Sequence, residues 1–429
     1  MSLNQKIIRT YTEILKEELL PAMGCTEPIA IAYAAAILRD ALGADPQSIR
    51  VGLSGNIIKN VKSVIVPATG GMHGIMAAVA AGVVAACPQK KLEVLCALTD
   101  EDRARIHTYL RSVDLKLNEL DTPNPFEIEM RGEADGKSAY VHLVHRHTNV
   151  VQVQCNGEDL TARYGNAEET ADSNPHADRR LLNVEDIIQF AEQIDLDELA
   201  PLLRRQVEMN MAIAEEGLKN EYGASIGRLL YADGNCDLRN RAKAYAAAGS
   251  DARMSGCELP VCIISGSGNQ GITASVPVVV YGRAHEVDEE TLLRSLIVSN
   301  LITVHQKTGI GCLSAYCGAI SAGCGCGTGI CFMNGGRYYE IAHTLVNAVA
   351  ILSGTICDGA KPSCAAKIAM AVEAGIMGYE MMLAGHQFYD GDGIITKGVE
   401  NTIRNVGRLA RDGMSGTDRE IIRIMLGEA

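Results

Sequence analysis

The sequence predicts an α+β fold dominated by helices, with glycine-rich loops and a small antiparallel β insertion. Long segments carry small apolar side chains at helical spacing, whereas short alternating runs rich in Val and Ile lie between residues 126 and 156. The 429 residues include 43 glycines and no Trp, and aromatic residues make up only 4%. The core is therefore expected to consist of aliphatic side chains and Met, packed closely over glycine.

The N-terminal part, residues 1–120, is expected to combine helices with a strand. An amphipathic helix begins near residue 3, and the Ala-rich run 29–38 predicts a buried helix. The segment IRVGLSGN, residues 49–56, is strand-like, and residues 75–86 predict a second apolar helix. This part carries two motifs with polar residues, GCTEP and SGN.

Residues 121–165 are expected to form the β insertion. The runs FEIEM, SAYVHLVH and VVQVQC alternate between apolar and polar residues, and EADGK supplies a glycine-containing turn between the first two. Residues 166–250 are expected to be a helical segment, with one or two helices over 183–218. Residues 251–429 are expected to be a cysteine-rich helical part, with a cysteine-rich loop over 310–329.

Charge and hydropathy restrict the class of partner. The net charge is −13 and no basic patch appears, so nucleic-acid binding is not expected. The longest apolar stretch, residues 75–87, has 13 residues, whereas a membrane span needs about 20. A cytoplasmic location is therefore expected, where thiols stay reduced. Glycine-rich apolar surface is compatible with a homo-oligomer.

The cysteines indicate a candidate metal site. Seven of the 14 cysteines lie within residues 312–364. The sequence has no C-x2-C pair, which counts against a structural zinc site. The spacings from Cys317 to Cys357 and from Cys357 to Cys364, 40 and 7 residues, favour loops that converge on one larger iron–sulfur cluster. The alternative is that these cysteines are inert buried residues.

The motif PAMGCTEP places Cys25 just before a predicted helix that has Pro28 in its first turn. The positive end of a helix dipole is expected to lower the pKa of this thiol and favour a thiolate. The alternative is that Cys25 only packs at the start of the helix.

Two loops, SGN at residues 54–56 and SGSGNQG at residues 265–271, offer hydroxyl and backbone N–H donors suited to a carboxylate or phosphate. Neither loop matches a P-loop or a complete dinucleotide-binding pattern. Three histidines in the predicted strand region are expected to lie on the surface or in a hairpin: His142, His145 and His147. We regard His305 and Lys307 as better candidates for lining a site.

Four segments in this order, PAMGCTEP, KSVIVPATGGMHG, SGSGNQGITASVPV and GTICDGAKPSCAAK, resemble the L-cysteine desulfidase and UPF0597 family, which is related to the α domain of iron–sulfur L-serine dehydratases. The resemblance extends from about residue 11 to residue 427. It implies a pyridoxal-independent β-elimination on L-cysteine that gives hydrogen sulfide, ammonia and pyruvate.

The resemblance also implies roles for individual residues. Cys317, Cys357 and Cys364 correspond to the three ligands of a 4Fe–4S cluster, and Cys25 corresponds to the active-site base. Cys357 and Cys364 are the firmer pair, because three other cysteines lie near the first ligand position: Cys312, Cys324 and Cys326. We expect the two polar loops to bind the small amino-acid substrate through Ser54, Asn56, Ser265 and Asn269.

The sequence leaves two other functions open. The same machinery suits an L-serine dehydratase, and relative rates with the two amino acids would distinguish them. A protein that senses or binds through an iron–sulfur cluster, without turning over a substrate, is the non-catalytic alternative.

Overall fold

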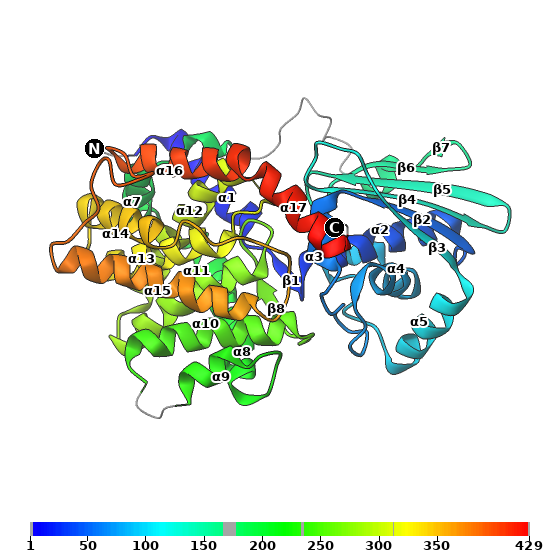
Figure 1. Cartoon of the computed structure of the whole chain (residues 1–429), viewed down its shortest axis with the longest axis horizontal. Coiled ribbons are helices and arrows are strands. Elements are labelled where there is room, and N and C mark those ends of the chain that lie inside the picture. The colour runs from blue at the N-terminus through cyan, green and yellow to red at the C-terminus, as the bar shows by residue number, and fades with distance from the viewer. Residues whose placement is uncertain (1–2, 166–176, 233–235, 312, 428–429) are drawn as a thin grey trace.

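The computed structural model describes residues 3–165, 177–232, 236–311 and 313–427, which form a sheet-containing lobe and a helical lobe (Figure 1). The α+β, helix-dominated fold class predicted from the sequence is confirmed. None of the described helices combines the length and apolar character needed to cross a bilayer.

The sheet lobe is built on a six-stranded sheet with the strand order β3-β2-β4-β5-β6-β7. Strands β2 and β3 are parallel, and every other neighbouring pair is antiparallel. The predicted strands of the insertion correspond to β4, β5 and β6. Because β2 and β3 add to them, segments 1–120 and 121–165 share one sheet. The strands are β2 (Ser48–Leu53), β3 (Asp114–Glu119), β4 (Glu127–Ala134), β5 (Lys137–Val144), β6 (Val150–Cys155) and β7 (Glu158–Asp159).

Two apolar helices form layers behind this sheet. Helix α2 packs against β4 and β5, and α4 packs against α2 on the side away from the sheet (Figure 1). The contact between α2 and α4 is close, because a Cβ on Gly82 would lie 2.0 Å from the carbonyl oxygen of Ala32. The helices of this lobe are α2 (Thr26–Leu42), α3 (Gly55–Val61), α4 (Gly74–Ala85), α5 (Asp100–Ser112) and α6 (Thr161–Tyr164), with a 3-10 segment at Pro88–Glu93.

The helical lobe surrounds α13 with α11, α12, α14 and α15. Its helices are α1 (Gln5–Glu18), α7 (Val184–Gln193), α8 (Ala200–Lys219), α9 (Ile226–Tyr231), α10 (Leu238–Met254), α11 (Gly268–Ala284), α12 (Glu289–Ile310), α13 (Gly318–Met333), α14 (Tyr338–Ile351), α15 (Cys364–Leu383) and α16 (Val399–Arg408), with a 3-10 turn at Arg179–Leu181 and a π-helical turn at Leu409–Gly413.

The expectation of a cysteine-rich loop over residues 310–329 is wrong for most of that stretch, because α13 begins at Gly318. Glycine normally disfavours a helix. Here its small size lets neighbouring backbones come close: a Cβ on Gly323 would lie 2.2 Å from the carbonyl oxygen of Ala371 in α15. Tertiary packing therefore outweighs the local propensity.

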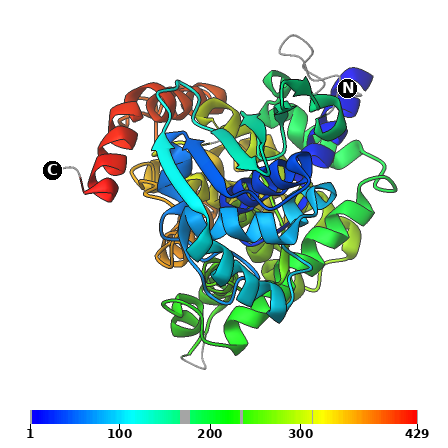
Figure 2. The same cartoon turned by 90° about the vertical axis from the view of Figure 1, so that its right-hand side faces the viewer.

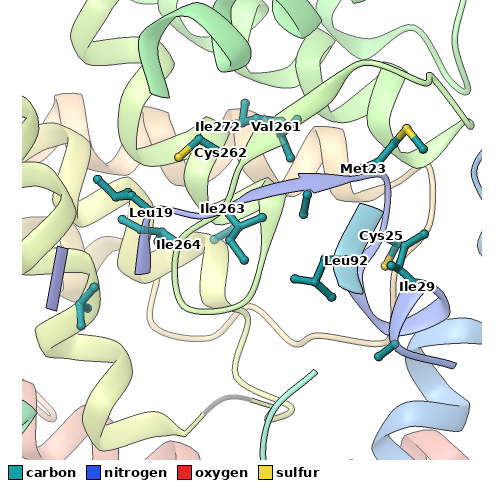
Figure 3. Close-up of a cluster of buried hydrophobic side chains, with 14 of the residues drawn as sticks. Leu19, Met23, Cys25, Ile29, Leu92, Val261, Cys262, Ile263, Ile264 and Ile272 are labelled. Atoms are coloured by element: carbon teal, nitrogen blue, oxygen red, sulfur yellow. The ribbon is translucent and has the colours of Figure 1, made fainter. Parts of the chain in front are cut away.

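Two of the contacts between the lobes involve named helices and strands in the described part of the chain. Strands β1 (Pro21–Met23) and β8 (Pro260–Cys262) pair in an antiparallel arrangement, and Figure 3 shows Cys25 where the chain turns from β1 into α2. Helix α17 (Ser415–Leu426) extends from the helical lobe and contacts α3 of the sheet lobe. Figure 2, viewed from the sheet side, shows α17 at the edge of the molecule.

Candidate functional site

A cavity of about 670 Å³ is lined by residues from both lobes, and we call it the interlobe cavity. The sheet lobe contributes the start of α2, the end of α3 and the turn after β5. The helical lobe contributes the C-terminal end of α10, the start of α11, the end of α12, and the loops before α13 and α15. Six of the residues predicted as site residues line it: Cys25, Ser265, Asn269, Cys317, Cys357 and Cys364.

The three predicted cluster cysteines lie on two loops that are joined by backbone hydrogen bonds. Cys317 directly precedes α13, Cys357 lies in the loop between α14 and α15, and Cys364 is the first residue of α15. The amide of Cys317 donates to the carbonyl oxygen of Thr355 at 3.1 Å, and the amide of Cys357 donates to that of Ala315 at 2.6 Å. Residues 40 positions apart in the sequence are thereby held on one wall.

These thiols interact with one another and with lysines. The thiol of Cys317 donates a hydrogen bond to Cys357, which lowers the pKa of Cys357, and the positive charges of Lys59 and Lys307 lower it further. The same hydrogen bond, followed by burial, raises the pKa of Cys317, and burial raises that of Cys364. Positive charge near the sulfurs stabilises thiolates and would also stabilise a negatively charged group bound by them.

The donor set fits an iron–sulfur cluster better than a single ion. The three sulfurs, all in the described part of the chain, do not converge to within 4.8 Å of one another, as ligands of one ion would. Ligands of a cluster bind separate irons, so they can lie farther apart.

The loop between Cys357 and Cys364 packs closely against α3. Its Gly359 has φ +94°, and a Cβ there would be 2.4 Å from the carbonyl oxygen of Lys59.

The other cysteines near the first ligand position lie elsewhere. Cys324 and Cys326 are buried inside the bundle around α13, and neither lines the interlobe cavity. The thiol of Cys326 donates to the carbonyl oxygen of Gly323 at 3.1 Å. Cys312 lies outside the described residues. Of the three described candidates for the first ligand, Cys317 alone lines the cavity.

Cys25 forms a pair with a buried acid, Glu27, which is not among the site residues predicted from the sequence. Its thiol donates to Oε2 of Glu27 at 3.1 Å, and the Glu27 carboxylate also accepts from the Thr26 hydroxyl at 3.1 Å and the Asn60 amide at 3.0 Å. Glu27 is 8% exposed. Burial by itself raises the pKa of Glu27, but His147 and the Cys25 thiol lower it, and the net shift is downward. Glu27 is therefore a buried carboxylate at neutral pH.

The prediction that the helix dipole would lower the pKa of Cys25 is wrong. Burial raises the pKa of this thiol well above its ordinary value, the negative charge of Glu27 raises it further, and the positive charge of Arg253 only partly opposes them. Cys25 is therefore protonated at rest. It can serve as a base only after its proton has moved to an acceptor, and Glu27 is in hydrogen-bonding contact.

The two predicted substrate loops differ in position. Neither Ser54 nor Asn56 is among the described residues that line the interlobe cavity. The Ser54 hydroxyl donates to the carbonyl oxygen of Pro125 at 2.9 Å and accepts from the amide of Glu127 at 3.2 Å, so it fixes the start of α3 against β4. The side-chain oxygen of Asn56 is buried and has no hydrogen-bond partner among the described residues.

Residues Ser265 and Asn269, from the second loop, do line the cavity. The amide of Ser265 donates to Oε2 of Glu18 at 2.8 Å, which ties this loop to α1. The side-chain oxygen of Asn269 accepts from Nη1 of Arg253 at 3.1 Å. Asn269 thus orients a buried cation at the cavity wall.

Five cavity residues carry a buried side-chain atom that has no hydrogen-bond partner in the described part of the chain. Only one of them, His147, is a candidate named from the sequence, with an expected position on the surface or in a hairpin. Buried polar atoms are normally paired, so such a group indicates a polar ligand. Gln270 belongs to the SGSGNQG loop and Tyr316 to the cysteine-rich segment 310–329. Asn60 and Arg253 lie in helices, and no sequence motif marks them as site residues. The atoms are Oδ1 of Asn60, Nε2 of His147, Nε of Arg253, Oε1 of Gln270 and the hydroxyl of Tyr316.

The histidine predictions are only partly correct. His147 lies in the connection between β5 and β6, in agreement with the expected surface or hairpin position, but it also lines the cavity, where burial lowers its pKa. His142 is half-buried and pairs with Glu127 at 2.9 Å. His305 pairs with Glu400 at 2.7 Å and is not a described cavity residue, whereas Lys307 is.

Comparisons with known proteins agree in pointing to one group. The profile of a family described as serine dehydratase alpha chain matches residues 89–423. A UPF0597 protein of Desulfitobacterium hafniense is 51% identical over 428 residues, which cover 100% of this chain and 99% of that protein. A UPF0597 protein of Treponema denticola is 46% identical, covering 99% of this chain and 100% of its own. A UPF0597 protein of Lachnoclostridium phytofermentans is also 46% identical, and the match covers 96% of this chain and 98% of that protein.

Proposed function

The chain belongs to the serine dehydratase alpha chain family, together with the UPF0597 proteins, and from that premise we propose that it is an iron–sulfur-dependent lyase acting on a small L-amino acid. The expected substrate is L-cysteine, and the expected products are hydrogen sulfide, ammonia and pyruvate. The observation that carries this proposal is that the three cysteines, Cys317, Cys357 and Cys364, and the Cys25–Glu27 pair line the same cavity.

Cys317, Cys357 and Cys364 would hold a 4Fe–4S cluster and leave one iron without a protein ligand. When bound, the cluster supplies a Lewis acid that stabilises charge on the leaving group, typically by several kcal/mol. The lysines near Cys357 favour its thiolate form, which is the form that binds metal.

The residues of the chain supply the proton transfers. Cys25 passes its thiol proton to Glu27, whose Oε2 already accepts that hydrogen bond at 3.1 Å. The Cys25 thiolate then takes the α-proton of the substrate as the bond from the β-carbon to its substituent breaks. A positioned base of this kind contributes about 10²- to 10⁴-fold. The proton on Glu27 is then available to the departing group, and aminoacrylate hydrolyses in water to pyruvate and ammonia.

L-Serine is the second candidate substrate, because the matching family is described as serine dehydratase alpha chain. The proton transfers are the same, and the leaving group is hydroxide in place of sulfide. The ratio of kcat/KM for L-serine and L-cysteine, measured on one anaerobic preparation, decides between the two.

The test begins with anaerobic reconstitution of the full chain, followed by counts of iron and acid-labile sulfide. We expect about four irons per chain, with sulfide and pyruvate released when L-cysteine is added. Cys357→Ser should lose iron and activity. Cys326→Ser makes the same change inside the α13 bundle, away from the cavity, and should retain both.

Two results would contradict the proposal. A wild-type chain that holds no iron after reconstitution rules out the cluster. A chain with a full cluster and no turnover of either amino acid favours a sensing or binding protein.

A further inference from the structure

We propose that the interlobe cavity contains a subsite for a free, zwitterionic α-amino acid. Arg253, oriented by Asn269, binds the α-carboxylate, and the side-chain oxygens of Asn60 and Gln270 accept hydrogen bonds from the α-ammonium group. This inference rests on the proposed function, which supplies the reaction. It adds the two groups of the substrate that the protein must recognise. These are an unmodified carboxylate and an unmodified amine.

The carboxylate side of the subsite is a buried cation that forms no ion pair with the described residues. Arg253 is 3% exposed. Its Nη1 donates to Asn269 at 3.1 Å, its Nε has no partner, and no carboxylate forms an ion pair with it in the described part of the chain. Burying a charge without a partner is costly. A guanidinium offers a planar set of donors that matches a carboxylate, so an α-carboxylate would supply the missing partner.

The ammonium side consists of neutral acceptors. Asn60 is 7% exposed and Gln270 is 5% exposed, and the side-chain oxygen of each is buried without a donor among the described residues. The orientation of the Asn60 amide is fixed, because its nitrogen donates to Oε1 of Glu27 at 3.0 Å and a carboxylate can only accept. A primary ammonium carries three hydrogens and can serve both oxygens.

Asn60 and Arg253, one residue from each side, interact with the Cys25–Glu27 pair. Asn60 is hydrogen-bonded to Glu27, and the charge of Arg253 acts electrostatically on both Cys25 and Glu27. An amino acid held at its two charged ends would therefore have its α-carbon near the Cys25 thiol, as removal of the α-proton requires. Esters and N-acyl derivatives lack one of the two charges and should bind poorly.

The experiment measures binding without turnover, using L-alanine because it has both charged groups and no leaving group on its β-carbon. Calorimetry on the anaerobically reconstituted full chain compares L-alanine with L-alanine methyl ester and with N-acetyl-L-alanine. We expect the wild-type chain to bind L-alanine at least about tenfold more tightly than either derivative, because each derivative leaves a buried polar group unpaired.

The variants assign each preference to its side of the subsite. In Arg253→Gln the ratio of the Kd of the ester to the Kd of L-alanine should fall to near one. The corresponding ratio for N-acetyl-L-alanine should stay as in the wild-type chain. In Gln270→Leu the preference over the N-acetyl compound should fall and that over the ester should persist. Arg205→Gln is the control: this arginine donates to the carbonyl oxygen of Leu19 at 3.2 Å and does not line the cavity, so both preferences should remain.

Two outcomes overturn the subsite: failure of the wild-type chain to bind L-alanine, or an ester preference that is unchanged in Arg253→Gln. If Arg253→Gln does not fold, Arg253→Lys keeps the charge without the planar donors, and Gln270→Leu tests the other side independently. Loss of sulfide release with intact discrimination would overturn the lyase and leave the subsite. Turnover without discrimination would overturn the subsite alone.

Discussion

The loop that carries two of the three candidate cluster ligands depends on a glycine. Gly359 has φ +94°, and its neighbour across the interlobe boundary is the backbone of α3. Replacing it with Ala should destabilise the protein and displace Cys357 and Cys364, which lie two and five residues away. Two separate free-energy costs contribute to this loss of stability. At another glycine of the chain, the same substitution incurs only one of them.

The first cost is conformational and the second is steric. A non-glycine residue at positive φ costs about 1–2 kcal/mol. The added Cβ would lie 2.4 Å from the carbonyl oxygen of Lys59, whereas an ordinary C···O contact is about 3.3–3.6 Å. Relieving such overpacking costs about 1–3 kcal/mol. Gly359→Ala should therefore lose about 2–5 kcal/mol of unfolding free energy.

Gly391 provides the matched control. Its φ of +98° is nearly the same, and nothing lies within 4 Å of the position that its Cβ would take. Gly391→Ala should lose only the conformational cost, about 1–2 kcal/mol.

The assay is urea unfolding of both variants and the wild-type chain, with iron counted after anaerobic reconstitution. Gly359→Ala should also hold less iron, and Gly391→Ala should not. Equal losses of stability in the two variants would refute the argument from close packing against α3.

Three further predictions concern a catalytic group, a buried acid and a helix contact. Glu27→Gln keeps a hydrogen-bond acceptor for Cys25 but cannot take its proton, so kcat should fall about 10²- to 10⁴-fold with iron content unchanged. The pKa of Asp251 is raised by burial to about 6, compared with 3.8 when exposed. Between these values the folded state binds a proton that the unfolded state does not, so the free energy of unfolding should fall as pH rises from about 4 to about 6, by on the order of 3 kcal/mol. That fall should be largely absent in Asp251→Asn. Gly82→Ala should destabilise the protein by about 1–3 kcal/mol despite the better helix propensity of Ala, because its Cβ would lie 2.0 Å from the Ala32 carbonyl oxygen.

Each of these predictions has a control and a contradicting outcome. For Glu27→Gln the control is Glu129→Gln on the outer face of the sheet, and a kcat within a few-fold of wild type would exclude Glu27 as the proton acceptor. For Asp251, urea unfolding at pH 4.5 and 7 measures how far the free energy of unfolding falls with pH in wild type and in Asp251→Asn. The same fall in both proteins would contradict a role for Asp251. For Gly82 the control is Gly416→Ala in α17, where nothing lies within 4 Å of the added Cβ and no loss is expected. Equal losses would exclude a steric cause.

Much of the secondary structure could be predicted because its signals are local. Alternation in FEIEM and SAYVHLVH predicts β4 and β5, and the apolar run after residue 28 predicts α2. Helix α13 could not be predicted in this way, because frequent glycine is typical of loops. Only the close approach of α15 at Gly323 explains why glycine is accommodated in this helix.

The sequence by itself determined the chemistry-bearing motifs: the three spaced cysteines, the GCTEP segment and the family to which they belong. The tertiary structure decided which residues meet and in what protonation state. Arg253 and Asn60 join Glu27 from separate helices, and no local pattern marks a residue whose partners are distant in the sequence. Cys25 shows the physical reason: a helix dipole is a local property and lowers the pKa of a thiol, but burial and a nearby carboxylate depend on the whole fold and have the larger effect.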